Sequence, residues 1–309
     1  MKLSLFLLLT VFTITAGISS AQDIQKQIDL KNALSDGRLK TSGDTTWKKI
    51  EFGANLNQGS FSSNWTGGGV NSVALGLFFN ALKEKKKGKN SWRNDFQSQY
   101  GIVRNKGQLS RKNVDRLYFD SKYNRELSSK WSLFGNINFL SQFGNGYEYS
   151  SDSDTVNFKK KVSGLFSPAY VTEAIGIEYR PVPYFFVDLA PGALRQTIVA
   201  DTKLYINTSD QKNFGVPIGD KVRTEVALLQ IVANFDKDIA KDINLKFRYL
   251  GYANIKHPLN IDDRLDAMIT AKIAKYFNVN LGAIVVYDQD QSKDVQFAQA
   301  LSIGFLYSF

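Results

Sequence analysis

The chain has 309 residues and a net charge of +10, and it combines 22 Phe, 14 Tyr and 4 Trp with a mean hydropathy of −0.25. This length fits one large barrel or two ordinary domains. The absence of cysteine excludes disulfides, thiolate catalysis and cysteine-ligated metals. A soluble protein has to bury so many rings, whereas a barrel in lipid carries them on its outer wall and keeps its polar residues inside.

Residues 1–21 have the pattern of a secretory signal peptide, with one Lys, an apolar run and the small residues Ser19-Ser20-Ala21. We expect cleavage after Ala21, and no Cys follows that would carry a lipid anchor. Residues 22–46 are polar and too short for a domain; we predict a periplasmic segment that either tethers the barrel or reaches into its lumen. Beyond the signal peptide no window approaches the roughly 20 apolar residues of a membrane helix, so an exported chain of this kind is soluble or a closed barrel.

From Trp47 onward, apolar residues recur at every second position, which is the period of a strand with one apolar face. About twelve such segments follow one another, an even number as in single-chain bacterial barrels. Turn-rich sequences separate them, among them the glycine-rich SNWTGGGVN (63–71), the basic KEKKKGKN (83–90), RPVP (180–183), DKDIAKD (236–242) and KYFN (275–278). We therefore predict that residues 47–309 are all-β.

Loop lengths and aromatic positions give this pattern an orientation. Long polar stretches, at about 144–167 and 195–219, follow the fifth and seventh segments, whereas the connections after the fourth, sixth and tenth are short. If the first strand rises from the periplasm, every long connection lies outside the cell. Aromatic residues near the starts of odd-numbered strands then share one height and predict a girdle at the periplasmic interface: Trp47, Trp92, Trp131, Tyr184 and Phe277.

These observations predict a transmembrane antiparallel up-and-down β-barrel of about 12 strands, with short periplasmic turns and longer extracellular loops that either stay outside or fold inward as a plug. The alternative is a soluble β-sandwich or ligand-binding barrel, which hides its apolar face in a core and shows its polar face to water. The two are distinguished by which face of the sheet is exposed outside.

The predicted inward faces carry charges of both signs. The cations are Arg93, Arg116, Lys122, Lys246, Arg248 and Lys272, and the acids are Glu51, Asp95, Asp120, Glu178 and Asp266. If the cations line an open constriction, they raise the local concentration of anionic solutes. If they pair with the acids across a narrow lumen, the barrel is closed and its role lies on its outer surfaces.

The last stretch, from Val295 to Phe309, alternates apolar residues with small and polar ones and ends on an aromatic ring. It resembles the C-terminal assembly signal of bacterial outer-membrane barrels, which implies that Phe305, Tyr307 and Phe309 serve recognition by the barrel-assembly machinery. A second resemblance lies in residues 52–76, which are similar to the leading motif of an outer-membrane barrel family of unknown function found in Bacteroidota. The residues that carry it are Asn57, Gln58, Gly59, Asn64, Trp65, Gly67, Gly68 and Gly69. This resemblance implies an envelope barrel and names no substrate.

Three further features are weak as functional sites. His257, the only histidine, stands in NIKHPLN without a neighbouring Ser or a matching Asn motif, so a role like that of outer-membrane phospholipases is a remote alternative. The loop from Asp288 to Asp294 opens like a calcium site but lacks the central Gly, and Gln299 stands at its twelfth place. The basic run 83–89 is expected to be a solvated turn and not a nucleic-acid site.

The basic lumen favours a narrow porin-like channel for small hydrophilic solutes, with a preference for anions. The alternative is a non-conducting structural or accessory subunit of an outer-membrane complex. We expect no enzymatic activity, no cofactor and no metal. The expected partners are outer-membrane lipid and lipopolysaccharide, the barrel-assembly machinery and envelope proteins.

Overall fold

The computed structural model describes residues 44–59, 71–149, 158–205, 212–256, 258–259, 261–287 and 295–308. The predicted signal peptide and most of the predicted periplasmic segment lie outside these residues, as do Asn64, Trp65, Gly67, Gly68, Gly69, His257, the loop Asp288–Asp294 and Phe309. Of Asn57, Gln58 and Gly59 only the backbone is described. No helix in the described ranges is long and apolar enough to cross a membrane.

Twelve strands form one closed antiparallel sheet in the described part of the chain. They are β1 (Thr45–Gly59), β2 (Ser72–Lys87), β3 (Asn90–Asn105), β4 (Arg111–Glu126), β5 (Trp131–Ser141), β8 (Ala169–Val182), the broken strand β9 (Phe185–Ala190) and β10 (Leu194–Ile198), β13 (Val222–Ala240), β14 (Ile243–Asn254), β15 (Ile261–Lys272), β16 (Phe277–Tyr287) and β17 (Gln296–Ser308). Both β9 and β10 pair with β8 and β13. The sheet closes where β17 pairs with β1, with Phe52 opposite Tyr307.

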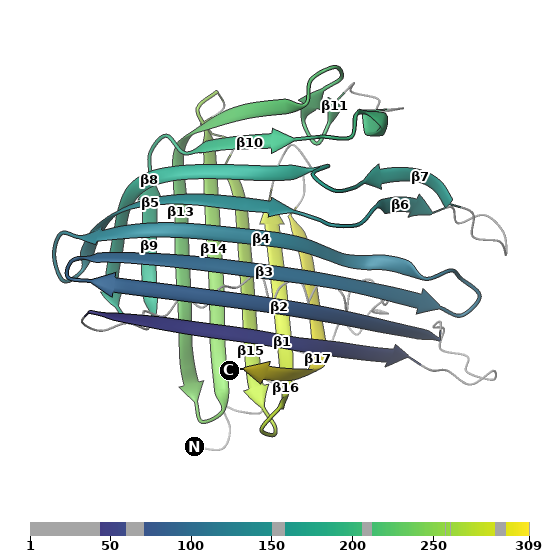
Figure 1. Ribbon diagram of the computed structural model, residues 1–309, viewed down its shortest axis with the longest axis horizontal. Coiled ribbons are helices and arrows are strands. Elements are labelled where there is room, and N and C mark those ends of the chain that lie inside the picture. The colour runs from purple at the N-terminus through teal and green to yellow at the C-terminus, as the bar shows by residue number, and fades with distance from the viewer. Residues whose placement is uncertain are drawn as a thin grey trace.

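The strands of opposite walls run in different directions. In Figure 1, β1–β5 run across one wall, and β13–β16 cross behind them on the other. A closed sheet needs this tilt of each strand against the barrel axis. The all-β barrel predicted from the alternation is therefore confirmed.

The two faces of the sheet differ as a membrane barrel requires. Along β2, Val73, Leu75, Leu77 and Phe79 point outward and are 41–55% exposed, whereas the alternate residue Glu84 is 2% exposed. The other walls follow the same rule, with buried inward residues such as Asp95, Gln97 and Glu178. Because the apolar face lies on the outside, the soluble alternative is wrong: its apolar face would be the buried one.

The long connections form a structured cap at one end of the barrel, which we define as the described residues of 142–168 and 199–221. It contains β6 (Gly146–Tyr149), β7 (Phe158–Ser163), η2 (Thr202–Tyr205), β11 (Lys212–Asn213) and β12 (Val216–Pro217). The β6–β7 hairpin extends beyond the ends of β5 and β8 (Figure 1). Ser167, Val199 and Val216 are fully buried in the cap, so its two connections pack together rather than lie as separate loops.

Several predicted turns are too long, because the strands extend past the membrane band. The basic run begins inside β2, which ends only at Lys87, and the turn is Gly88-Lys89. Likewise β13 continues to Ala240 and β16 already begins at Phe277. Charged residues end an apolar pattern without ending the backbone pairing, and pairing is what defines the strand. β1 begins at Thr45 rather than Trp47.

Candidate functional site in the barrel lumen

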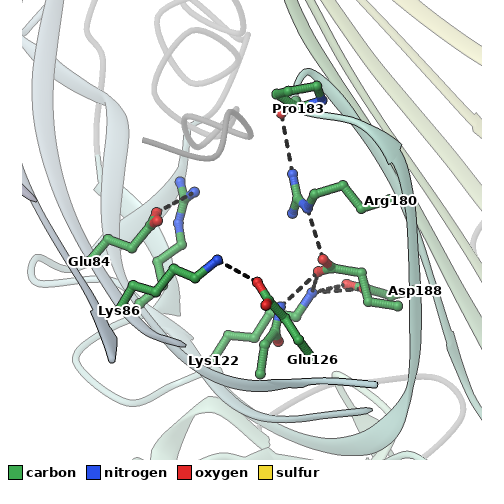
Figure 2. Close-up of polar contacts among 10 residues, drawn as sticks. Glu84, Lys86, Lys122, Glu126, Arg180, Pro183 and Asp188 are labelled. Atoms are coloured by element: carbon green, nitrogen blue, oxygen red, sulfur yellow. Dashed lines mark hydrogen bonds and ion pairs between the residues drawn. The ribbon is translucent and has the colours of Figure 1, made fainter. Parts of the chain in front are cut away.

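Eight charged side chains from five strands gather on the lumen wall near the short-turn end, which is the periplasmic end in the predicted orientation. We call this cluster the ion-pair network; Figure 2 shows its contacts. Its acids are Glu84, Glu126, Glu178 and Asp188, and its bases are Lys86, Arg93, Lys122 and Arg180. The inward side of the strand pleat places all eight in the interior, because each follows the alternation of its own strand.

Lys122 of β4 is the centre of the network. Its Nζ lies 2.6 Å from Oε2 of Glu178 on β8 and 2.6 Å from Oδ2 of Asp188 on β9. The rings of Phe134 and Phe186 also contact the ammonium group of Lys122, each with its centroid 4.6 Å from Nζ. The three charged side chains are only 3–12% exposed. Charges removed from water in this way persist only when they are paired and hydrogen-bonded.

The remaining cations of the network also have acidic partners. Nε of Arg180 donates to Oε1 of Glu178 at 2.9 Å, and Lys86 pairs with Glu126 at 2.5 Å. Arg93 lies 3.9 Å from Glu84. With four bases and four acids, the network is electrically neutral. The anionic-channel hypothesis requires a surplus of positive charge on the lumen wall. This part of the wall has none, because each cation of the network is balanced by an acid.

Higher in the lumen, most other predicted charges also have polar partners. Nη1 of Arg116 donates to Oε1 of Gln97 at 2.5 Å, and its guanidinium lies 4.4 Å from the centre of the Tyr118 ring. Asp120 accepts from the amides of Asn136 and Asn138, each at 3.3 Å.

On the opposite wall Lys246 pairs with Asp236 at 3.1 Å. Asp266 pairs with Arg264, and Arg248 lies opposite Asn234 of β13 and Asp266 of β15. Glu51 pairs with Lys49 at 2.7 Å, and the amide of Gln97 contacts Asp95 at 3.3 Å. Lys272 is opposite Asn278 at the end of β15 and is exposed.

A short apolar cluster interrupts the polar lumen at the break between β9 and β10. Ala190 and Ala193 flank the break and are buried against Phe134, Ala174, Ala227 and Tyr252. The close approach requires Gly176 of β8, because a Cβ there would stand 2.0 Å from the carbonyl oxygen of Leu189. Gly192 supplies the positive φ of +77° at the break. Pro191-Gly192 is the sequence signal for this feature, and it falls inside the predicted seventh strand.

Some buried lumen amides lack partners. Gln99 is 1% exposed, yet neither Nε2 nor Oε1 makes a hydrogen bond. Oε1 of Gln230 and the hydroxyl of Tyr252, opposite each other on β13 and β14, are likewise without a partner. Buried polar groups of this kind are normally satisfied by water. These three residues therefore indicate a hydrated part of the lumen.

The predicted girdle residues do not all share one face. Trp92, Trp131 and Phe277 point outward and are 43–53% exposed. Tyr184 stacks edge-on against outward-facing Phe235, with ring centroids 5.7 Å apart. Trp47 is different: it lies opposite Glu84, on the lumen side of β1, so it is not part of an outward girdle. Trp47 lies near the start of its strand, as predicted, but the alternation along β1 puts its side chain on the inward face and not on the outward one.

The predicted assembly residues lie at the closing seam. Phe305 contacts the rings of Tyr276 and Phe277, and Tyr307 contacts Tyr276 and Phe52 of β1. Among the described residues, no group of three or more His, Asp and Glu side chains is arranged to hold a metal ion.

Part of the chain matches one family model, and several solved structures match it at low similarity. Residues 56–147, from the end of β1 into β6, match the model of a family described as "Protein of unknown function (DUF3078)". No curated protein sequence matches the chain. Similar solved structures include the translocator domain of the autotransporter NalP from Neisseria meningitidis, with 12% identity, TM-score 0.33, and coverage of 91% of this chain and 94% of that one.

The NanC porin has 7% identity and a TM-score of 0.39, with coverage of 83% of this chain and 98% of that one. The TodX monoaromatic hydrocarbon channel has 7% identity and a TM-score of 0.34, with coverage of 87% of this chain and 89% of that one. TM-scores of this size add nothing to the fold described above.

Proposed function

We propose that this outer-membrane barrel is closed at rest and acts as a non-conducting structural or accessory subunit of the outer membrane, with its cap as the presented surface. The observation that carries this proposal is the neutral ion-pair network. The predicted anionic channel needs cations that face an open lumen, and in the network each cation has an acidic partner at 2.5–3.9 Å. An anion that enters has to compete with carboxylates already in place.

The pairing has an energetic consequence. Removing one partner from a buried ion pair leaves an uncompensated charge, at a cost of about 3–5 kcal/mol. Separating Lys122 from both acids to open the lumen therefore destabilises the barrel. The apolar cluster at Ala190 and Ala193 supports the same proposal, because it packs buried side chains of β5, β8, β13 and β14 tightly together.

Swelling of proteoliposomes tests this function. The folded protein is reconstituted and diluted into isotonic gluconate, arabinose or arginine, which are anionic, neutral and cationic solutes of similar size. We expect no swelling beyond that of protein-free liposomes with any of them. Swelling with all three would show an open, unselective pore, and swelling with gluconate alone would restore the anionic channel; either result contradicts the proposal.

A narrow channel remains the second candidate, because the unpartnered buried amide of Gln99 indicates water inside the barrel. Under this candidate, Arg116 and Arg248 face the conducting path, and replacing both by Glu reverses ion preference in a planar bilayer. Unchanged preference in a conducting protein contradicts a role for these two residues.

Several expectations stay proposals: origin in Bacteroidota, export by residues 1–21, and contacts with lipopolysaccharide, the assembly machinery and envelope proteins. We also propose that the barrel is not an enzyme. Lipid hydrolysis that disappears in His257→Ala would contradict this.

A further inference from the structure

The turn between β7 and β8 carries two exposed apolar side chains at its tip. Gly164 and Ser167 pair with each other through two backbone hydrogen bonds, at 2.9 and 3.0 Å, which leaves Leu165 and Phe166 as the tip residues. Leu165 is 51% exposed and Phe166 is 42% exposed. Two adjacent exposed apolar side chains form a candidate contact surface when the neighbouring wall is apolar too.

The tip is held rigidly against the barrel rim. Ser167 is fully buried; its carbonyl accepts from the amide of Gln142 at 2.9 Å and its hydroxyl accepts from the backbone N–H of Asp201 at 2.8 Å. The backbone N–H of Ala200 donates to the carbonyl of Phe166 at 3.0 Å. Phe166 has φ +52°, a conformation that costs an L-residue about 1–2 kcal/mol and persists only where the surroundings hold it.

The ring of Phe166 lies on the outer wall of the barrel and not over its mouth. Its centroid is 6.0 Å from that of Phe139 on β5, in an edge-to-face arrangement. Phe139 belongs to the outward face, opposite exposed Phe119 of β4. The tip is therefore continuous with the apolar surface that faces lipid.

The height of this contact fits the edge of the membrane. Trp131 belongs to the outward aromatic belt at the short-turn end. Phe139 lies eight residues after Trp131 on β5. At a rise of about 3.3 Å per residue and a tilt of about 40°, they differ by about 20 Å in height. The apolar band of such barrels is about 25 Å tall. Phe139 and Phe166 thus lie near its cap-side boundary.

We propose that Leu165 and Phe166 insert into the acyl chains of the outer leaflet and so anchor the cap to the membrane surface. This interaction surface does not depend on whether the lumen is open or closed. It gives a reason for the strained backbone of Phe166, since the turn directs that ring onto the outward-facing Phe139. Because Ser167 joins the tip to Asp201, membrane contact at one loop also fixes the other.

The chain has no cysteine, so single nitroxide labels report the environment of chosen sites directly. Leu165→Cys is the test site and Ile137→Cys, on the outward face of β5, is the lipid reference. Phe214→Cys is the matched control: it is an exposed apolar residue, also at φ +52°, in the turn between β11 and β12 beside Arg223. Folding of each variant is checked by heat-modifiable migration.

In proteoliposomes we expect the Leu165 label to collide with oxygen and to be shielded from nickel(II) ethylenediaminediacetate, as at Ile137, whereas the Phe214 label shows the reverse. A Leu165 label as accessible to the nickel complex as the Phe214 label would overturn the proposal. A second variant, Leu165→Trp, should lose more fluorescence than the wild-type protein in lipids brominated near the headgroup, since Trp92 and Trp131 of the wild type already face lipid. Quenching equal in amount to that of the wild type would show that the emission of the added Trp is unquenched and would also overturn the proposal.

Discussion

At the scale of single residues, Lys122 is the side chain on which the lumen depends most. It is the shared partner of Glu178 and Asp188, and all three are largely buried. We predict that Lys122→Met destabilises the barrel by about 3 kcal/mol, because two acids lose their common cation. The measurement is urea unfolding in lipid, followed by tryptophan fluorescence.

Two variants control this prediction. Lys161→Met removes a cation from an exposed pair in the cap and should cost less than about 1 kcal/mol. The combination Lys122→Met and Asp188→Asn removes one charge of each sign, keeps the pair between Glu178 and Arg180, and should recover most of the loss. Equal effects of Lys122→Met and Lys161→Met would show that the network does not hold the barrel.

A second residue-scale prediction concerns acid pH in the cap. The hydrogen bond from Lys161 Nζ, with that from the backbone N–H of Lys203, lowers the pKa of Asp201 below its usual value. A lowered pKa means that the contact stabilises the cap at neutral pH and is lost as pH falls through the folded-state value. A nitroxide at Thr202→Cys should be immobile at pH 7 and become mobile in acid.

The partner variant Lys161→Met supplies the control for this titration, since it should make the same label mobile already at pH 7. A label whose spectrum is unchanged between neutral and strongly acidic pH would contradict a role for Asp201 in holding the cap.

At the scale of elements, the closing strand β17 carries the prediction on assembly. Its outward rings, Phe305 and Tyr307, contact Tyr276, Phe277 and Phe52, so they join the last strand to both neighbours. Replacing Phe305, Tyr307 and Phe309 by Ser should leave unfolded protein in the periplasm. Ile303→Ser, on the same outward face of β17 but away from these rings, should still give heat-modifiable barrel in the outer membrane. Normal assembly of the triple variant would refute the role of the C-terminus.

The elements were largely predictable, because an alternating strand has to pair and a barrel has to place its apolar face outside. Parity gave the inward faces of β3, β4 and β8, and loop lengths gave the two ends. The break at Pro191-Gly192 was missed because it depends on packing between neighbouring strands, which the alternation within one strand does not report. Ala190 and Ala193 approach β8 closely there, at Gly176. The structure of the cap was missed for the same reason: its hydrogen bonds join residues far apart in the sequence, such as Ser167 and Asp201.

The candidate site was predictable only in part. Residue types and parity identified Lys122, Arg93 and Glu178 as inward charges. Whether they pair depends on the distances between strands β4, β8 and β9, which one-dimensional spacing does not contain. Five further residues complete the network, namely Glu84, Lys86, Glu126, Arg180 and Asp188. Of these, Glu84, Lys86 and Arg180 lie in sequences that read as turns.

At the scale of the whole molecule, three layers lie along the barrel: the neutral network at the short-turn end, the apolar break within the lumen and the packed cap at the other end. Each is held by contacts within this chain, and the proposed closed barrel rests on the three together. The lipid-facing wall is separate from these layers, because inward and outward side chains of a strand lie on opposite faces of the sheet.

Single-channel recording of the purified, refolded protein in a planar bilayer tests the closed barrel most directly. Folding is verified beforehand by heat-modifiable migration, and a salt gradient reports ion preference. We predict no stable conductance steps for the folded wild-type protein. Stable steps would contradict the closed barrel, and steps with anion preference would show that the cations of the lumen face an open path after all.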